Sequence, residues 1–144
     1  MSKAKKTRNA LTWSEAKYWG LIRSSLRKAF QFWKPIQLAK KMARIRVERL
    51  KSSSETEKRR WGKHRFGYVC SFCQGTFKDN ECVVDHVYPV GALRQLSDLA
   101  GFVNRLTAED PNSYQVLCHE CHQTKTNIEA KERTLKRSGQ TSLF

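Results

Sequence analysis

The chain has 144 residues and a formal net charge of +15 at pH 7, from 28 lysines and arginines against 13 acidic residues. This length allows one domain with an appendage, and no stretch is long and apolar enough to be a transmembrane helix. The start of the chain lacks the apolar segment of a secretory signal, so we expect an intracellular protein that is neither secreted nor membrane-bound. In that compartment cysteines are more often metal ligands than disulfides.

The positive charge is confined to one half of the chain. Residues 1–66 contain 20 Lys and Arg against 4 Asp and Glu, a net of +16, whereas residues 67–144 contain 8 against 9, a net of −1. Such an imbalance favours a polyanionic partner, with nucleic acid as the first candidate and an anionic membrane surface as the second.

Two helices are predicted in this basic half. Thr12 and Glu15 form a capping box, and apolar residues then recur every three or four positions from Trp19 to Trp33. Pro35 ends this helix or opens the next one, a weaker amphipathic stripe from Ile36 to Leu50. The aromatic residues of the region are expected to pack the helices together; they are Trp13, Trp19, Phe30, Phe32 and Trp33.

The second predicted helix carries the densest positive charge. Residues 40–51 and 58–65 are expected to contact phosphates, with Lys40, Lys41 and Arg44 as the named candidates. Residues 52–60 look like a linker. We therefore expect a basic helical DNA-binding extension over residues 1–60, a second domain over residues 61–134 and a tail over residues 135–144.

The second domain alternates between strand and helix patterns. Residues 66–90 are strand-like, with turns marked by glycines and by Asp79-Asn80, and residues 82–86 form the clearest strand. Residues 91–110 have helical spacing, with Gly101 as a possible break. Residues 114–118 form a short second strand, and a polar helix opens near Cys121.

Four of the five cysteines form two CxxC motifs, Cys70 with Cys73 and Cys118 with Cys121. Two such pairs suit a tetrahedral structural zinc ion, whereas a redox dithiol needs only one pair. Because 44 residues lie between the motifs, the zinc ion would join the two ends of a larger functional unit. Cys82 is left over, and we expect it to be buried as a small hydrophobic residue.

Three polar residues lie beside this predicted zinc site. Asp85 and His86 end the first strand, and His122 lies in the first turn of the following helix. A strand, a second strand and a helix would bring Asp85 and His122 onto one divalent ion, with His86 beside a water molecule. Hydrolysis of a phosphodiester bond needs a base near neutral pH and a cation for the developing charge.

The segments VVDHVYPVG and YQVLCHECHQTKT, bracketed by the CxxC motifs, resemble the HNH endonucleases of the ββα-metal class. The resemblance spans roughly residues 60–128 and is nearest to the small zinc-containing nucleases of bacteriophages and prophages. It implies an α+β fold in which a ββα-metal unit with a four-cysteine zinc site follows basic N-terminal helices. It also implies cleavage of double-stranded DNA, in the cytoplasm of a bacterial host if the protein is phage-encoded.

The resemblance also implies a role for each site residue. Asp85 and His122 would bind the catalytic Mg²⁺ or Mn²⁺, His86 would act as the general base, and Lys125 would lie near the DNA backbone. The structural zinc would be held by the four motif cysteines, Cys70, Cys73, Cys118 and Cys121. Cleavage would leave a 5′-phosphate and a 3′-hydroxyl.

One position departs from the family pattern. The family reads N-L-Q-x-L-C, in which the asparagine braces the two strands, whereas this chain has Ser113 in that slot and Asn112 one residue earlier. Asn112 in a shifted register, or the Ser113 hydroxyl, would have to take the bracing role. The alternative function is therefore a zinc-stabilised, non-catalytic nucleic-acid-binding protein on the same scaffold. A membrane-surface protein leaves the Asp85-His86 pair unexplained.

Overall fold

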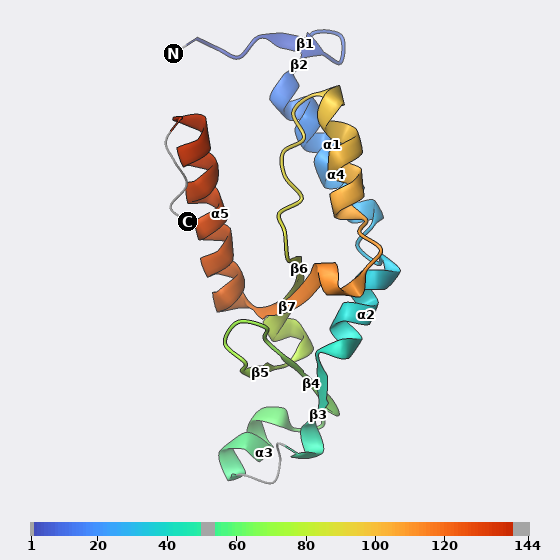
Figure 1. Ribbon diagram of the computed structural model, residues 1–144, viewed down its shortest axis with the longest axis vertical. Helices are drawn as coiled ribbons and strands as arrows, with labels where there is room; N and C mark the ends of the chain where they lie inside the picture. The colour runs from blue at the N-terminus through green and yellow to red at the C-terminus, as the bar shows by residue number, and fades with distance from the viewer. Residues whose placement is uncertain (1, 50–53, 140–144) are drawn as a thin grey trace.

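The computed structural model describes residues 2–49 and 54–139, and it is mixed α+β, as predicted (Figure 1). Its helices are α1 (Glu15–Ala29), α2 (Lys34–Met42), α3 (Glu55–Trp61), α4 (Leu99–Leu106) and α5 (His119–Arg137). Its strands are β1 (Lys6–Arg8), β2 (Trp13–Ser14), β3 (Arg44–Arg46), β4 (Phe66–Val69), β5 (Thr76–Phe77), β6 (Cys82–His86) and β7 (Tyr114–Cys118).

The strands form three small antiparallel sheets, β1-β2, β3-β4-β5 and β6-β7. In the last sheet Cys82 lies opposite Cys118 and His86 opposite Tyr114, so all five residues of each strand are paired. Helix α5 begins directly after β7 and packs against both strands. The predicted strands over 82–86 and 114–118 and the helix after them are therefore confirmed, and together they form a β-β-α unit.

The second predicted helix is shorter than expected. It ends at Met42, and the next residues form β3, which pairs with β4. The reason is that the pattern of burial changes from helical spacing to alternation. Arg44 and Arg46 are exposed, whereas Ile45 and Val47 are covered, as in a strand. Leu50 of the predicted stripe lies outside the described residues.

The predicted linker also contains a helix. Ser54 caps α3, its hydroxyl accepting a hydrogen bond from the Glu57 amide at 3.2 Å, and Trp61 at the end of α3 is buried. Residues 50–53 of the surrounding segment lie outside the described residues. Because β3 pairs with β4, backbone hydrogen bonds run across the predicted domain boundary at residue 60.

The first helix starts two residues later than predicted. Ser14 is the cap of α1, accepting from the Lys17 amide, whereas the Thr12 hydroxyl donates to the Asn9 carbonyl. The Glu15 carboxylate pairs with Arg8 instead of completing a capping box. Helix α1 then ends at Ala29, and Pro35 lies in the first turn of α2, so the predicted break is confirmed.

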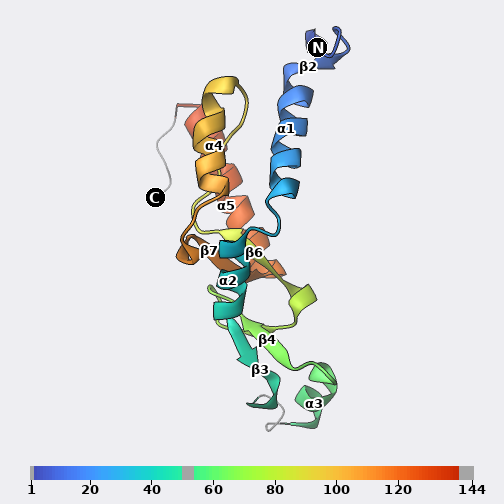
Figure 2. The same ribbon diagram turned by 90° about the vertical axis from the view of Figure 1, so that its right-hand side faces the viewer.

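The main hydrophobic cluster joins α1, α4 and the segment between β6 and α4. Its buried members are Trp19, Val90, Leu93, Phe102 and Leu106. Figure 2 shows α1 and α4 running alongside each other, and the cluster takes its members from both helices. Gly101 lies inside α4 without breaking it.

Two sequence expectations for buried residues have different outcomes. Phe32 was expected in the helix packing, but its side chain is 75% exposed in the turn between α1 and α2. Cys82 is buried, as expected, and its thiol donates to the Lys78 carbonyl at 3.3 Å. No helix in the described part of the chain combines the length and apolarity that crossing a membrane requires.

Two glycines provide a matched test of the packing around β4. A Cβ atom at Gly67 would lie 2.8 Å from Thr76 Cγ2 and 2.9 Å from the Trp61 ring, whereas one at Gly20 in α1 meets only the flexible Arg23 side chain at 3.8 Å. We expect Gly67→Ala to lower the free energy of unfolding by about 1–3 kcal/mol. Gly20→Ala should raise it by up to about 1 kcal/mol through helix propensity. Urea unfolding monitored by circular dichroism measures both, and changes of equal sign would contradict this packing.

Candidate functional site

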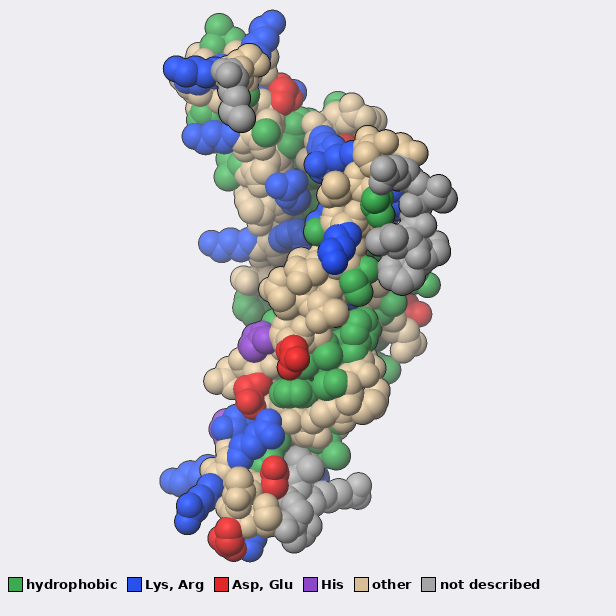
Figure 3. All heavy atoms as spheres, turned by 90° about the vertical axis from the view of Figure 1, so that its left-hand side faces the viewer, with side chains coloured by type: hydrophobic (Ala, Val, Ile, Leu, Met, Phe, Trp, Pro, Cys, Tyr) green, Lys and Arg blue, Asp and Glu red, His purple; other side chains and the backbone are tan. Residues whose placement is uncertain are grey.

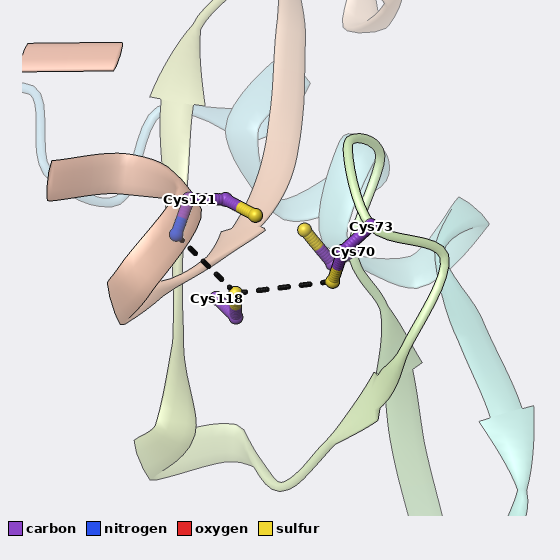
Figure 4. Close-up of side chains that lie close together, drawn as sticks. All are labelled: Cys70, Cys73, Cys118 and Cys121. Atoms are coloured by element: carbon purple, nitrogen blue, oxygen red, sulfur yellow. Dashed lines mark hydrogen bonds between the residues drawn. The ribbon is translucent and has the colours of Figure 1, made fainter. Parts of the chain in front are cut away.

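The four motif cysteines come together in space (Figure 4). Cys70 and Cys73 lie in the turn after β4, and Cys118 and Cys121 lie at the junction of β7 and α5. Their sulfur atoms all lie within 4.8 Å of one another, and those of Cys73 and Cys118 are 4.0 Å apart. A zinc ion with Zn–S bonds of about 2.3 Å needs sulfur–sulfur edges of about 3.8 Å. The cluster therefore suits a metal ion such as zinc.

Backbone hydrogen bonds hold the two motifs beside each other. The Ser71 amide donates to the Val116 carbonyl at 2.9 Å, which attaches the first motif to β7. The Cys70 amide donates to the Gly75 carbonyl at 2.9 Å and closes the turn of that motif. The second motif is shaped by the start of α5, where Cys118 Sγ accepts from the Cys121 amide at 3.4 Å.

The thiols of the cluster differ in acidity. Burial raises the pKa of Cys70, but the amides of Cys118, Cys73 and Phe72 outweigh it and bring the pKa to about 6. The hydrogen bond with Cys118, together with burial and the other thiols, raises the pKa of Cys121 to about 12. Without a cation, thiols this close cannot all ionise, and a bound metal ion displaces the remaining protons.

His86 lies at the end of β6 with its ring half-buried. Its Nε2 is 3.1 Å from the Leu106 carbonyl, and because a carbonyl only accepts, Nε2 carries the proton. The lone pair of the neutral ring is then on Nδ1. The Tyr114 ring lies 4.8 Å from the imidazole, and the Tyr114 hydroxyl donates to the carbonyls of Leu106 and Ala108. Tyr114 thus fixes the same carbonyl that orients His86, a role that the sequence analysis did not identify.

Asp85 and His122 also meet, as the sequence analysis expected. Asp85 Oδ1 lies 3.9 Å from His122 Nε2, across the junction between β6 and the first turn of α5. Asp85 Oδ2 is buried and lies 2.8 Å from the Lys125 ammonium, its partner in an ion pair. A carboxylate oxygen and an imidazole nitrogen are ligands that divalent ions accept, and these two residues supply them here.

Lys125 lies elsewhere than the resemblance implied. Its side chain is only 12% exposed, and its ammonium pairs with both Asp85 and Glu129 instead of facing solvent beside DNA. Burial lowers the pKa of Lys125, but the two carboxylates outweigh it and leave the pKa raised. Sequence reasoning missed Glu129, although its position four residues after Lys125 on a helix is the usual spacing of such a pair.

Of the two candidate bracing residues, Ser113 joins the strands through its backbone. The Ser113 carbonyl accepts from the Val87 amide at 2.9 Å, which extends the β6–β7 ladder by one bond. Asn112 is exposed in the 3₁₀ turn Pro111–Ser113, where its backbone N–H donates to the Asp110 carboxylate. Among the described residues, neither side chain makes a hydrogen bond to β6.

The three named phosphate-contact candidates have different surroundings. Lys40 pairs with Asp79 and is partly covered. Lys41 and Arg44 are exposed, and the Arg44 guanidinium lies 4.1 Å above the Phe66 ring. Lys41 and Arg44 therefore present cations to solvent, whereas the charge of Lys40 is balanced within the chain.

Comparison with models of protein families, with curated proteins and with solved structures gave no match to this chain. The assignment of a function therefore rests on the residues and contacts described above.

The cysteine cluster can be tested by its metal content. We expect the purified protein to contain about one zinc ion per chain and Cys118→Ser to lose it, because three thiols and a hydroxyl hold zinc poorly. Cys82→Ala is the control, since Cys82 is buried outside the cluster, and it should keep the zinc. Elemental analysis by mass spectrometry measures both variants. A Cys82→Ala protein depleted of zinc as fully as Cys118→Ser would contradict the assignment.

Proposed function

We propose that this protein is a metal-dependent DNA endonuclease of HNH type that hydrolyses phosphodiester bonds. The observation that carries the proposal is the meeting of three groups at one strand–helix junction. Asp85 Oδ1 lies 3.9 Å from His122 Nε2. His86 follows Asp85 on the same strand, and the Leu106 carbonyl orients its neutral ring. The four-cysteine cluster fastens that junction, because Cys118 precedes α5 directly.

The proposed chemistry uses His86 as the general base. With the proton on Nε2 engaged by Leu106, Nδ1 has the lone pair that takes a proton from the attacking water. Asp85 and His122 would hold Mg²⁺ or Mn²⁺, which when bound supplies positive charge to the phosphoryl and leaving oxygens. Two protein ligands leave room on such an ion for the phosphate.

Lys125 and Glu129 would tune this site. The Lys125 ammonium balances the Asp85 carboxylate, and Glu129 holds the ammonium from the other side. A divalent ion on Asp85 would repel Lys125, and Glu129 offers the displaced ammonium a second partner. Lys125 is thus proposed as a positioning residue for Asp85 in place of a DNA contact.

The DNA would be held by the basic half of the chain. The net charge of +16 over residues 1–66 supports binding to a polyanion, and exposed Lys41 and Arg44 are the candidates for phosphate contact in α2 and β3. Helix α2 packs on β7, so these cations lie on the same unit as the proposed catalytic groups. The proposed substrate is double-stranded DNA.

One observation favours the alternative, a zinc-stabilised nucleic-acid-binding protein without catalysis. The Lys125 ammonium already lies where a cation would neutralise Asp85, so the carboxylate has a partner without any bound ion. A pure binding protein, however, has no use for an oriented neutral His86 beside Asp85 and His122. We therefore place the nuclease first.

Cleavage of supercoiled plasmid separates the two functions. We expect the wild-type protein to nick or cut the plasmid with Mg²⁺ or Mn²⁺, and His86→Ala to be slower by about 10²–10⁴-fold, the usual contribution of a general base. His64→Ala, which removes an exposed histidine from the loop before β4, should retain wild-type activity. Equal cutting by the wild type and His86→Ala would remove the base assignment. Tight binding with no cutting by either would support the alternative.

The pH dependence of cleavage is also expected to be unusual for a histidine. Burial lowers the pKa of His86 below its ordinary value of 6.5, and the Leu106 carbonyl and the Asp85 carboxylate, which favour the charged ring, offset only part of this. A base must be unprotonated, so the rate should fall with decreasing pH only below 6.5. Single-turnover rates at saturating DNA give the profile. A midpoint of the acidic limb above 6.5 would contradict the assignment.

A further inference from the structure

Five arginines converge on one groove that the proposed catalytic groups do not occupy. The groove has a volume of about 310 Å³ and lies between α1, α5 and the connection from β6 to α4. Its floor is formed by Gly91, which has no side chain, and Ala92, which has a small one, so little side-chain volume fills the groove there. We call it the arginine groove, after its basic lining residues Arg23, Arg27, Arg94, Arg133 and Arg137.

The arginines are arranged by helix geometry. Arg23 and Arg27 are four residues apart on α1, and Arg133 and Arg137 are four residues apart on α5, so each pair lies on one face of its helix. The two pairs come from helices on opposite sides of the connection that bears Arg94 (Figure 1). Figure 3 shows Lys and Arg side chains over the upper half of the face it presents, with few acidic side chains among them, and a second group at the lower end beside several acidic ones.

The groove has no carboxylate of its own to balance this charge. Within residues 2–49 and 54–139, none of the five arginines has an acidic side chain at ion-pairing distance. At the margins, Glu15 is engaged by Arg8 and Glu129 by Lys125, and Glu132 lines the adjoining pocket together with Arg133 and Arg137. Like charges four residues apart on a helix repel each other and destabilise the helix. An anion bound between the arginines would reduce this repulsion.

The residue type narrows the class of anion. All five basic residues of the groove are arginine, although the chain has 15 lysines and 13 arginines. Guanidinium groups bind phosphate oxygens through two parallel hydrogen bonds, which an ammonium group cannot do. Facing pairs with a fifth arginine between them suit a ligand with several phosphates in a row. A membrane surface is less suited, because a groove presents its charges inward and the floor offers no large apolar side chain.

Two elements that line the groove also lead to the proposed catalytic groups. The connection that forms its floor leaves β6 directly after His86. The Arg27 guanidinium lies 5.9 Å from the Phe102 ring, and its charge acts on the His86 imidazole. Helix α5 starts beside the site with His122 and reaches Arg133 eleven residues later, about 17 Å along its axis. That span corresponds to a few nucleotides of a duplex strand.

From these observations we propose that the arginine groove binds the phosphate backbone of duplex DNA and leads the strand to His86. The inference rests on the proposed function for its substrate. It assigns the main DNA contacts to arginines on both halves of the sequence, three of them in the half with a net charge of −1.

The test compares two triple variants that each remove three positive charges. Arg23→Gln, Arg133→Gln and Arg137→Gln together change the groove, while Arg27 stays because it packs on Phe102. Arg59→Gln, Lys63→Gln and Arg65→Gln change exposed residues in and after α3, at the opposite end of the molecule (Figure 2). Fluorescence anisotropy with a short duplex, without divalent ions, gives the affinity of each protein as a function of salt.

We expect the groove variant to bind DNA at least tenfold more weakly and to lose about 2–3 from the slope of log affinity against log salt. The α3 variant removes three charges from residues 58–65, which the sequence analysis expected to contact phosphates, and on the present proposal it should lose less than about threefold. Zinc content and urea unfolding, unchanged in both, establish that the exposed substitutions leave the fold intact. Equal losses in the two variants would overturn the proposal, since overall charge would then explain binding. Tighter binding of the wild type to phosphatidylserine vesicles than to DNA would overturn it too.

A second measurement needs no variant. Phenylglyoxal modifies exposed guanidinium groups, and peptide mass mapping locates each modified arginine. With the wild-type protein, duplex DNA should protect Arg133 and Arg137 and leave Arg59 reactive. Protection of Arg59 with full reactivity at Arg133 would reject the groove as the binding surface.

The proposal and the nuclease function can fail separately. If the groove variant binds DNA poorly and the wild type cuts no plasmid, the groove stands and the nuclease proposal fails. If the groove variant binds and cuts like the wild type, the groove fails and the nuclease proposal stands. His86→Ala should bind the duplex with wild-type affinity, because Nδ1 is used only for proton transfer.

Discussion

Pairing of β6 with β7 determines where every candidate catalytic atom lies. The two strands are 27 residues apart in the chain, yet five residues of one lie opposite five of the other, and α5 follows without a linker. A shift of one residue would send Asp85 to the other face of the sheet and away from His122. The thiol cluster prevents that shift, because Cys118 belongs both to β7 and to the group of sulfurs, and Ser71 hydrogen-bonds to Val116.

The parts of this arrangement that sequence reasoning anticipated are those with strong local signals. The strand Cys82–His86 contains consecutive β-branched residues, and the CxxC motifs mark the ends of the unit by their own chemistry. The meeting of Asp85 with His122 followed from the order strand, strand, helix. By contrast, β3 is only three residues long and sits in a basic stretch that continues the composition of α2, so its change of period was too brief to recognise.

The missed contacts all depend on partners far away in the chain. Lys125 was expected near the DNA backbone, and its pairing with Asp85 depends on a residue forty positions earlier. The role of Tyr114 needs the Leu106 carbonyl, which only the packing of α4 supplies. The arginine groove combines α1, α5 and the connection between β6 and α4, and charge counted along the sequence gives no sign of it. Composition located the excess charge in residues 1–66, but three of the groove arginines lie in the other half.

Leu106 links folding to proton transfer. Its side chain is buried in the hydrophobic cluster with Trp19 and Phe102, while its carbonyl accepts from both His86 and Tyr114. A packing defect between α1 and α4 would therefore tilt the imidazole without touching any polar residue. For the proposed nuclease, substitutions deep in this cluster would belong among the determinants of turnover, and selection on catalytic rate would act on residues whose visible role is packing.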